Sequence, residues 1–394
     1  MKYSVLDLES SVKNKGEESI GSFAANPFHP DNYIVMGGYT VQGYDAVRVY
    51  GAHTGATKPS FRPDKTIDML VGQNIGFDLL LMLLDERSRE ECIEWLKKGR
   101  IWDTMLAEYI LTAQNAHGTS LKLDALSKKY GGTIKDEKIK QYWDDGVETE
   151  DIPTGELEEY LVADVNNTRL VFLHQLKQCI DRGILPLVIE MMDARLATIM
   201  MEYDGIHFDI KAANEYLVDL TLRELSVTGL IADFLAACYP SDFVTEVWTS
   251  QKVVHPALFG GEVKYEVRHK TGVFKSGAKK GKPRFKIEKK THNMVGALEG
   301  HTLPEGLVKG KNGMYSLDEN ALKLLREIVP KGSFIEAFLG DMLKLREIKK
   351  EREMTQSLID LTWHDSKLHP RYNHTVTKTG RLSATAPNPQ QVTK

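Results

Sequence analysis

Acidic residues near the start of the chain have the types and spacing of a metal-dependent hydrolytic site. Asp7 and Glu9 are two residues apart in a segment that alternates like a β-strand, so both carboxylates should point to one face. Asp78 lies where a short apolar strand passes into a helix. Tyr160 and Asp164 are four residues apart on a predicted helix and should therefore share a face.

These side chains fit the hydrolysis of a phosphodiester bond. At neutral pH the reaction needs an activated water and a neutralised leaving oxygen, and two divalent metals about 3.5–4 Å apart provide both. Mg²⁺ and Mn²⁺ prefer oxygen ligands, which Asp7, Glu9, Asp78 and Asp164 supply. The hydroxyl of Tyr160, one helical turn before Asp164, can orient the attacking water.

Each of these patterns also has an ordinary explanation. A lone D-x-E is most often a solvated strand pair, an Asp after an Asn and an aromatic often caps a helix, and a Y-x-x-x-D face is usually surface. The occurrence of all three in this order, within one domain-sized stretch, favours the metal site.

The three patterns resemble the motifs of the tyrosine-type DEDD proofreading exonucleases, which have an RNase H-like fold. The matching segments are Asp7-Leu8-Glu9, Asn74-Ile75-Gly76-Phe77-Asp78 and Tyr160-Leu161-Val162-Ala163-Asp164. The resemblance implies an α/β RNase H-like 3′→5′ exonuclease domain whose four carboxylates hold two metal ions, with Tyr160 positioning water and Asn74 contacting the DNA strand. Trp102–Ala107 and Ser120–Leu126 resemble segments between the second and third motifs. Asp103 in the first of them either supports the site or caps a helix.

The elements that must position these residues can be predicted from periodicity and turn signals. We expect strands at Lys2–Leu8, Tyr33–Met36, Ala46–Tyr50 and Thr66–Gly72, and helices at Phe77–Leu84, Trp102–Thr112, Leu121–Tyr130 and Leu157–Ile180, with a turn at Asn115–Ser120. These make an exonuclease domain over residues 1–186. Further helices are expected over Leu187–Leu235, with a break at Gly205, and over Leu317–Val329 and Ser333–Leu361. The end of the chain, Tyr372–Lys394, reads as strand and loop.

A second resemblance lies near the end of the chain. Thr379–Ser383 and Pro387–Gln391 resemble the T-G-R-L-S and P-N-L-Q-N segments that open the palm of family A DNA polymerases, although Pro389 and Gln391 replace the usual Leu and Asn. In that family an Arg and nearby amides touch the primer–template. The resemblance therefore implies DNA contacts by Thr379, Arg381, Asn388 and Gln390.

Together the resemblances describe the N-terminal part of a bacteriophage-type family A polymerase. Met201–Asp209 and Leu258–Gly261 resemble passages of that family, the second of phage members. We expect a helical thumb-like region over 187–361, with a basic insertion at 262–290, and the start of a palm at 362–394. The polymerase catalytic carboxylates should be absent from this chain, since no Asp or Glu follows Ser383. His364-Asp365 precedes the palm segment and is interpreted as a turn.

The stretch 262–290 has a net charge of +8, from 11 basic and 3 acidic residues. Tyr265, Phe274 and Phe285 lie among the lysines. The segment is either a solvated loop or a surface that follows nucleic-acid phosphates, and we favour the second interpretation. The whole chain carries −4, so binding to DNA requires such a local patch.

The amino-acid composition limits the classes of protein to which the chain can belong. The 394 residues predict at least two domains, and three scattered cysteines favour a reducing cytoplasm over a disulfide framework or zinc site. No apolar run approaches the roughly 20 residues of a membrane helix. The expected partners are a single-stranded 3′ end of DNA and primer–template DNA. If the enzyme is split, a C-terminal polymerase fragment is a further expected partner. The expected location is the cytoplasm, which is that of the host cell if the gene is phage-encoded. Two alternatives stay open: a stand-alone RNase D-like 3′→5′ exoribonuclease, and a non-catalytic DNA-binding subunit of a split polymerase.

Overall fold

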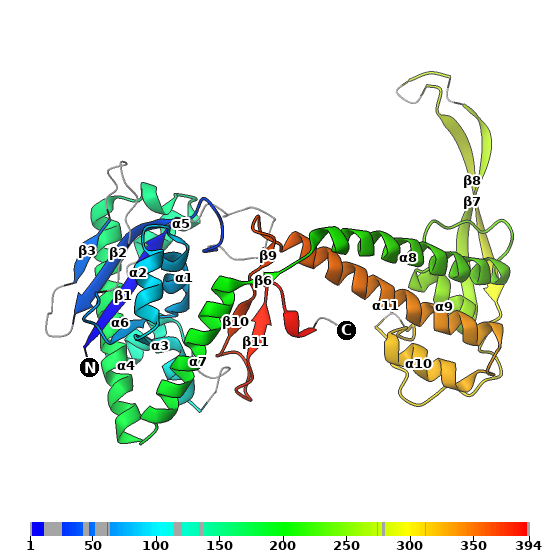
Figure 1. The fold of residues 1–394 in the computed structure, drawn as a ribbon. Helices are drawn as coiled ribbons and strands as arrows, with labels where there is room; N and C mark the ends of the chain where they lie inside the picture. The colour runs from blue at the N-terminus through cyan, green and yellow to red at the C-terminus, as the bar shows by residue number, and fades with distance from the viewer. Residues whose placement is uncertain are drawn as a thin grey trace. The chain divides into compact units, whose positions relative to one another are not determined.

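The computed structural model describes residues 2–11, 26–41, 47–51, 61, 64–113, 120–133, 137–273, 275–277, 280–311 and 313–391. Phe274 and the predicted turn at 115–119 lie outside these residues. The chain forms two compact units, the first comprising Met1–Ile210 with Asp360–Lys394 and the second Lys211–Ile359 (Figure 1). The division into segments 1–186, 187–361 and 362–394 concerns function and stays a prediction.

The first unit contains a mixed five-stranded sheet of order β3-β2-β1-β4-β5. Strand β2 is antiparallel to both β1 and β3, whereas β4 runs parallel to β1 and β5 parallel to β4. Apolar residues fill both faces of β1, so the sheet is covered on both sides. The strands are β1 (Tyr3–Ser10), β2 (Ile34–Val41), β3 (Arg48–Tyr50), β4 (Met69–Gly72) and β5 (Arg100–Asp103).

The helices predicted in this part of the chain are all present, with small shifts at their ends. The predicted helix at Leu157–Ile180 begins earlier, after Pro153, which suits the first turn of a helix because it lacks an N–H. The helices are α1 (Gly76–Leu84), α2 (Arg89–Leu96), α3 (Thr104–Leu111), α4 (Leu123–Tyr130), α5 (Glu137–Asp144), η1 (Thr149–Asp151), α6 (Thr154–Asp181) and α7 (Leu185–Asp204).

Helix α6 lies close against the sheet because β2 has a glycine at the point of contact. A Cβ at Gly38 would lie 3.0 Å from Cγ of Leu161 and 3.2 Å from Cγ2 of Val165. Further along α6, the ring of Phe172 packs edge-on against Tyr3 and Trp102, with centroids 4.9 and 5.4 Å away. A larger residue at position 38 would push the helix away from β1.

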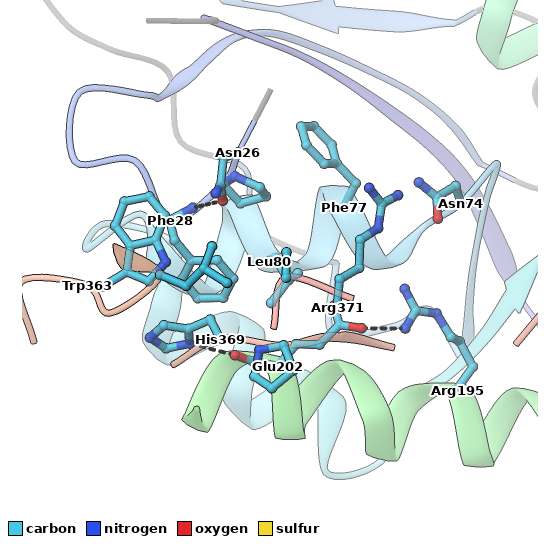
Figure 2. A pocket seen from close by; sticks show the side chains of 14 residues that line it. Asn26, Phe28, Asn74, Phe77, Leu80, Arg195, Glu202, Trp363, His369 and Arg371 are labelled. Atoms are coloured by element: carbon cyan, nitrogen blue, oxygen red, sulfur yellow. Dashed lines mark hydrogen bonds and ion pairs between the residues drawn. The ribbon is translucent and has the colours of Figure 1, made fainter. Parts of the chain in front are cut away.

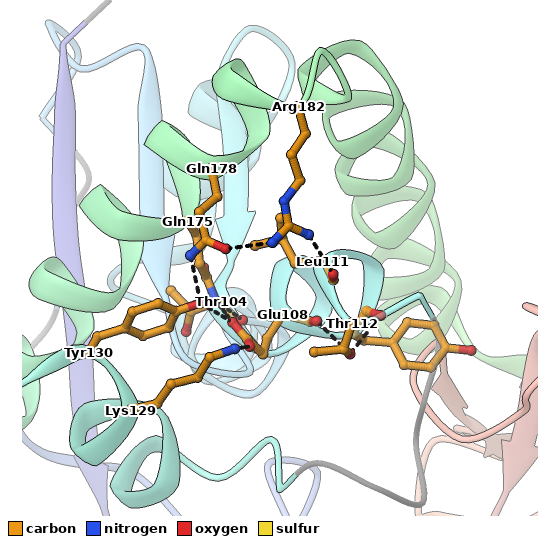
Figure 3. A network of polar contacts seen from close by, with 10 residues as sticks. Thr104, Glu108, Leu111, Thr112, Lys129, Tyr130, Gln175, Gln178 and Arg182 are labelled. Carbon is orange, nitrogen blue, oxygen red and sulfur yellow. Dashed lines mark hydrogen bonds and ion pairs between the residues drawn. The ribbon is translucent and has the colours of Figure 1, made fainter.

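A buried polar network fixes the same helix against α3 and α4 (Figure 3). The Glu108 carboxylate pairs with Lys129 and accepts hydrogen bonds from Tyr130 Oη at 2.8 Å and Gln175 Nε2 at 3.0 Å. Gln175 Nε2 also donates to the Thr104 carbonyl at 2.9 Å. Since a buried carboxylate is stable only when paired and hydrogen-bonded, this network favours one register of α6.

The C-terminal segment of the chain completes the first unit. Strand β6 (Ile206–His207) pairs with β9 (Lys367–Leu368), and β10 (Arg371–Asn373) pairs with β11 (Ser383–Thr385), which is followed by η2 (Pro389–Gln391). The predicted break at Gly205 is confirmed: this residue has φ +65° and ends α7. His364 and Asp365 form the turn expected from the sequence.

The second unit contains α8 (Ile210–Cys238), α9 (Gln251–Phe259), β7 (Gly261–Val273), β8 (Pro283–Met294), α10 (Glu319–Ile328) and α11 (Phe334–Asp360). Helices α8 and α11 share a core in which Phe234 stacks on Phe338, with centroids 4.2 Å apart. The basic stretch is not a loop: it forms most of the antiparallel ribbon β7–β8. Among the described residues, no helix has the length and apolar character needed to cross a membrane.

Candidate metal centre

Three of the four predicted carboxylates come together at one place. One ligand oxygen from each of Asp7, Glu9 and Asp164 lies within 4.8 Å of the others. Asp7 and Glu9 share a face of β1, and Asp7 is paired with Gly38, over which α6 passes closely enough to bring Asp164 to the strand. Oxygen ligands at this spacing suit a hard divalent cation, so the residues present fit a metal such as Mg²⁺ or Mn²⁺.

Asp78 lies beside this group and is held by the backbone of β1. The pairing of β1 with β4 ends at Val5 and Val71, which leaves the next part of β1 without a strand on that side. The carboxylate of Asp78, from the helix after β4, accepts a hydrogen bond from the Leu8 N–H at 3.0 Å. Because Leu8 lies between Asp7 and Glu9 on β1, this hydrogen bond holds the Asp78 carboxylate next to both of them.

The electrostatics of Asp78 are those of a crowded acidic site. Burial raises the pKa of its carboxyl well above the usual range, and the charges of Glu9 and Asp103 raise it further, against the lowering effect of the Leu8 N–H. A bound cation would favour the ionised form of this carboxylate.

Tyr160 lies one turn before Asp164 on α6, as predicted. Its half-buried ring packs edge-on against Trp143, with centroids 5.8 Å apart and planes at 89°. The Trp143 ring is itself held by a hydrogen bond from Nε1 to Thr149 Oγ1 at 3.1 Å. The tyrosine therefore has a supported orientation on the helix that carries Asp164.

The turn before α1 is built around Asn74 and Asp103. Asn74 has φ +55°, a left-handed conformation that asparagine tolerates better than most residues. Its N–H donates to the Asp103 carboxylate at 3.0 Å, which also accepts from the Met105 N–H at 3.0 Å and so caps α3. Asp103 thus acts as a helix cap, and it also fixes the turn from which Asp78 follows.

A pocket with a cavity of about 50 Å³ adjoins this turn (Figure 2). Phe28 and Trp363 lie at one end, and Asn74 and Arg371 lie at the other. Its floor includes the buried ion pair of Arg195 with Glu202, whose closest atoms are 3.0 Å apart.

This ion pair was missed from the sequence. Glu202 accepts the Tyr372 N–H at 2.9 Å and Arg195 donates to the Tyr372 carbonyl at 3.4 Å, so both charges bind the backbone of β10. The available signal was two opposite charges seven residues apart, which share a face of the helix with the apolar residues Val188, Met192 and Ile199.

The predicted DNA-contacting residues near the chain end lie outside the strands: Thr379 is in a turn, Gln390 is in η2, and Arg381 and Asn388 are in irregular segments. Thr379 and Arg381 are exposed, and the Thr377 hydroxyl donates to the Arg381 carbonyl at 2.6 Å. Asn388 Oδ1 accepts the Gln390 N–H at 3.1 Å. Their contact with DNA, like that of Asn74, stays a prediction.

The match to a protein family concerns the later part of the chain. Residues 283–394 match the family model for DNA polymerase family A. This agrees with the resemblance of Thr379–Ser383 and Pro387–Gln391 to the palm of that family. No curated protein sequence matches the chain.

The fold is similar to a solved polymerase domain. The structure is described as the POL domain of Pol1 from M. smegmatis in complex with DNA primer-template and dNTP; the identity is 16% and the TM-score 0.58. The similarity covers 92% of this chain but 50% of the mycobacterial chain. The chain thus has a mixed α/β fold similar to that polymerase domain, and spans about half of its length. The bacteriophage type stays a prediction.

Proposed function

We propose that this chain is a segment of a family A DNA polymerase of DNA replication, and that its N-terminal part is an RNase H-like 3′→5′ exonuclease. The observation that carries the exonuclease is the convergence of Asp7, Glu9 and Asp164, with Asp78 bound to Leu8 between the first two. The match of residues 283–394 to the polymerase family supports the wider assignment.

In the proposed reaction two divalent ions supply an activated water and stabilise the leaving oxygen. Asp7, Glu9, Asp78 and Asp164 would hold these ions. Tyr160, fixed by Trp143, positions the attacking water, and Asn74 contacts the substrate strand. The strand order and the mixed directions within the sheet support the RNase H-like assignment.

The two alternatives are less well supported. A stand-alone RNase D-like enzyme would not account for the polymerase match over 283–394. A non-catalytic DNA-binding subunit of a split polymerase would not need carboxylates gathered within 4.8 Å of one another. A C-terminal polymerase fragment as partner remains part of the proposal.

The test is an exonuclease assay with the purified full chain and Mg²⁺ or Mn²⁺. A single-stranded DNA labelled at its 5′ end should shorten from the 3′ end with release of mononucleotides, and chelation should stop the reaction. Asp7→Ala and Asp164→Ala should each remove most of the rate, because each empties a metal position. Asp124→Ala, on exposed surface of α4, is the matched control and should retain it. Degradation at the wild-type rate by Asp164→Ala would refute the assignment, and equal cleavage of RNA would favour the RNase D-like alternative.

A further inference from the structure

The ribbon β7–β8 is fixed at its base and exposed beyond it. At the base, Val263 and Met294 are buried in the core of the second unit. Tyr265 Oη donates to Asp242 Oδ1 at 2.8 Å, and Lys290 Nζ lies 2.6 Å from Asp242 Oδ2. These contacts hold the direction of the ribbon relative to its own unit.

Beyond these contacts the described residues of both strands are exposed, from Arg268 to Val273 and from Pro283 to Lys289 (Figure 1). Three of them are large apolar residues: Val273 is 51% exposed, Phe285 45% and Ile287 53%. An isolated pair of strands is at best marginally stable in water, and apolar side chains on it gain nothing there. The outer half of the ribbon therefore has the character of a surface that binds a partner.

The positive charges lie on both faces of this outer half. Directly opposite residues of an antiparallel pair share a face, and side chains alternate along each strand. Arg268 is paired with Ile287 and Lys270 with Phe285, so these two cations and two apolar residues share one face. Arg284 and Lys286 alternate with Phe285 on β8 and lie on the other face.

From this distribution we propose that the outer half of β7–β8 enters a groove of duplex nucleic acid and contacts phosphates on both sides. A major groove about 12 Å wide admits a two-stranded β-ribbon, and a chain of phosphates borders it on each side. A flat acidic protein surface or an anionic membrane would engage one face and leave the cations of the other face in solvent. The inference rests on the proposed function, in which the chain holds duplex DNA.

Binding of this kind is independent of base sequence. Lysine is a compact charge that neutralises a phosphate without reading a base edge, and lysines predominate in the segment. Phe285 and Ile287 then contact sugars and base edges inside the groove. The affinity should depend steeply on salt, because every neutralised phosphate releases counterions.

The experiment compares two matched double variants in the full chain. Arg268→Gln with Lys270→Gln removes two cations from one face, and Arg284→Gln with Lys286→Gln removes two from the other. A control, Lys177→Gln with Lys323→Gln, removes the same charge from lysines that pair with acids on their own helices. Binding of a fluorescent blunt duplex of mixed sequence is measured by anisotropy between 50 and 300 mM NaCl, with EDTA present so that nothing is degraded.

Each ribbon variant should make the slope of log affinity against log salt shallower by up to about 1.8, or about 0.9 per contact. At 0.1 M salt this corresponds to a loss of up to about eightfold per contact and about 60-fold per pair. The control should change neither quantity appreciably. Far-ultraviolet circular dichroism and the melting temperature should be unchanged in all variants, since every replaced residue is exposed.

Several outcomes would overturn the inference. If neither ribbon pair changes the slope, the ribbon does not contact phosphate. If only one pair does, a single face is used and insertion into a groove is wrong. If poly-glutamate or phosphatidylglycerol vesicles displace the duplex as well as unlabelled duplex does, at equal charge, then the partner is an acidic protein or a membrane surface.

Failure of this inference can be told from failure of the proposed exonuclease. The ribbon variants should still release mononucleotides from a short single strand at the wild-type rate, whereas Asp164→Ala should bind duplex with the wild-type salt slope and lose most of that release. Duplex binding through both faces by a wild-type chain without nuclease activity would support the ribbon and refute the exonuclease.

Discussion

The buried ion pair between Arg195 and Glu202 should be a main stabilising contact of the C-terminal segment. The Arg195 side chain is 8% exposed and that of Glu202 3%. Both also bind the backbone of Tyr372, more than 160 residues later in the chain. We consider three variants: Arg195→Met, Glu202→Gln, and both together.

The expected loss in the free energy of unfolding depends on which charge each variant leaves without its partner. Arg195→Met leaves the Glu202 carboxylate buried without its cation and still accepting the Tyr372 N–H, which should cost about 3–5 kcal/mol. Glu202→Gln retains an acceptor for that N–H but leaves the guanidinium with longer bonds, to Thr198 at 3.3 Å and the Tyr372 carbonyl at 3.4 Å. The double variant buries no charge at these positions, so its loss should be smaller than the sum of the single losses by about 1–3 kcal/mol.

The assay is urea unfolding followed by tryptophan fluorescence in a Trp248→Phe background. Four of the five tryptophans, at 95, 102, 143 and 363, belong to the first unit, so this background reports that unit alone. Replacing the exposed pair Lys177 and Asp181 is the control and should change the free energy of unfolding by no more than about 0.5 kcal/mol. Additive losses in the Arg195 and Glu202 variants, or a loss below about 1 kcal/mol for Arg195→Met, would refute the reasoning.

Three further predictions use the same preparations. Tyr160→Phe should slow mononucleotide release less than Asp164→Ala, because it removes a water-orienting hydroxyl and leaves the metal positions intact; an equal loss in both would contradict this. Burial lowers the pKa of His374 to about 4, so between pH 6.5 and 4 the unfolded chain binds the proton first and stability falls as the pH falls. With a discount for partial exposure, the wild type should lose about 1–2 kcal/mol more than His374→Gln between pH 7 and 4.5 in urea unfolding, and equal losses would count against it. Gly205→Ala should destabilise by about 1–3 kcal/mol, since its φ is +65° and a Cβ would meet His369 at 2.7 Å; Gly229→Ala, in an open position inside α8, should be neutral or stabilising when melting temperatures are compared.

The parts of the fold that could be predicted from the sequence depend on local patterns. The strand at Lys2–Leu8 and the long helix through Tyr160 and Asp164 follow from their periodicity, and both are confirmed. Because a strand alternates and a helix repeats about every fourth residue, the local direction of Asp7, Glu9 and Asp164 could also be predicted. Their meeting required the close passage of α6 over Gly38, which the periodicity of the strand and the helix does not predict; the resemblance of the three motifs to an exonuclease family was the basis for expecting it.

The ribbon β7–β8 was not predicted because its sequence lacks the usual strand signal. A half-buried strand alternates between apolar and polar residues, whereas the outer part of this ribbon carries basic residues on both faces and has apolar residues at few positions, among them Phe285 and Ile287. The alternation Val263, Tyr265 and Val267 is present only near the base, where the ribbon packs on its unit. When neither face of a strand packs on a core, nothing requires its apolar and polar residues to alternate.

The ion pair also explains why the first compact unit includes the C-terminal segment Asp360–Lys394, whereas the sequence predicted that residues 362–394 form a separate region. Glu202 and Arg195 belong to α7, just beyond the predicted exonuclease segment, and their principal backbone partner is Tyr372 in the segment that matches the polymerase family. Nothing in the local sequence around Arg195 and Glu202 predicts that they contact a strand more than 160 residues later in the chain. In the structure they combine into one buried contact, because a charge in the interior requires a partner of opposite sign and β10 offers both an N–H and a carbonyl at the same residue. The residues of the candidate exonuclease and strands β10 and β11, which lie in the last part of the polymerase match, are therefore held in one folded unit by contacts with α7.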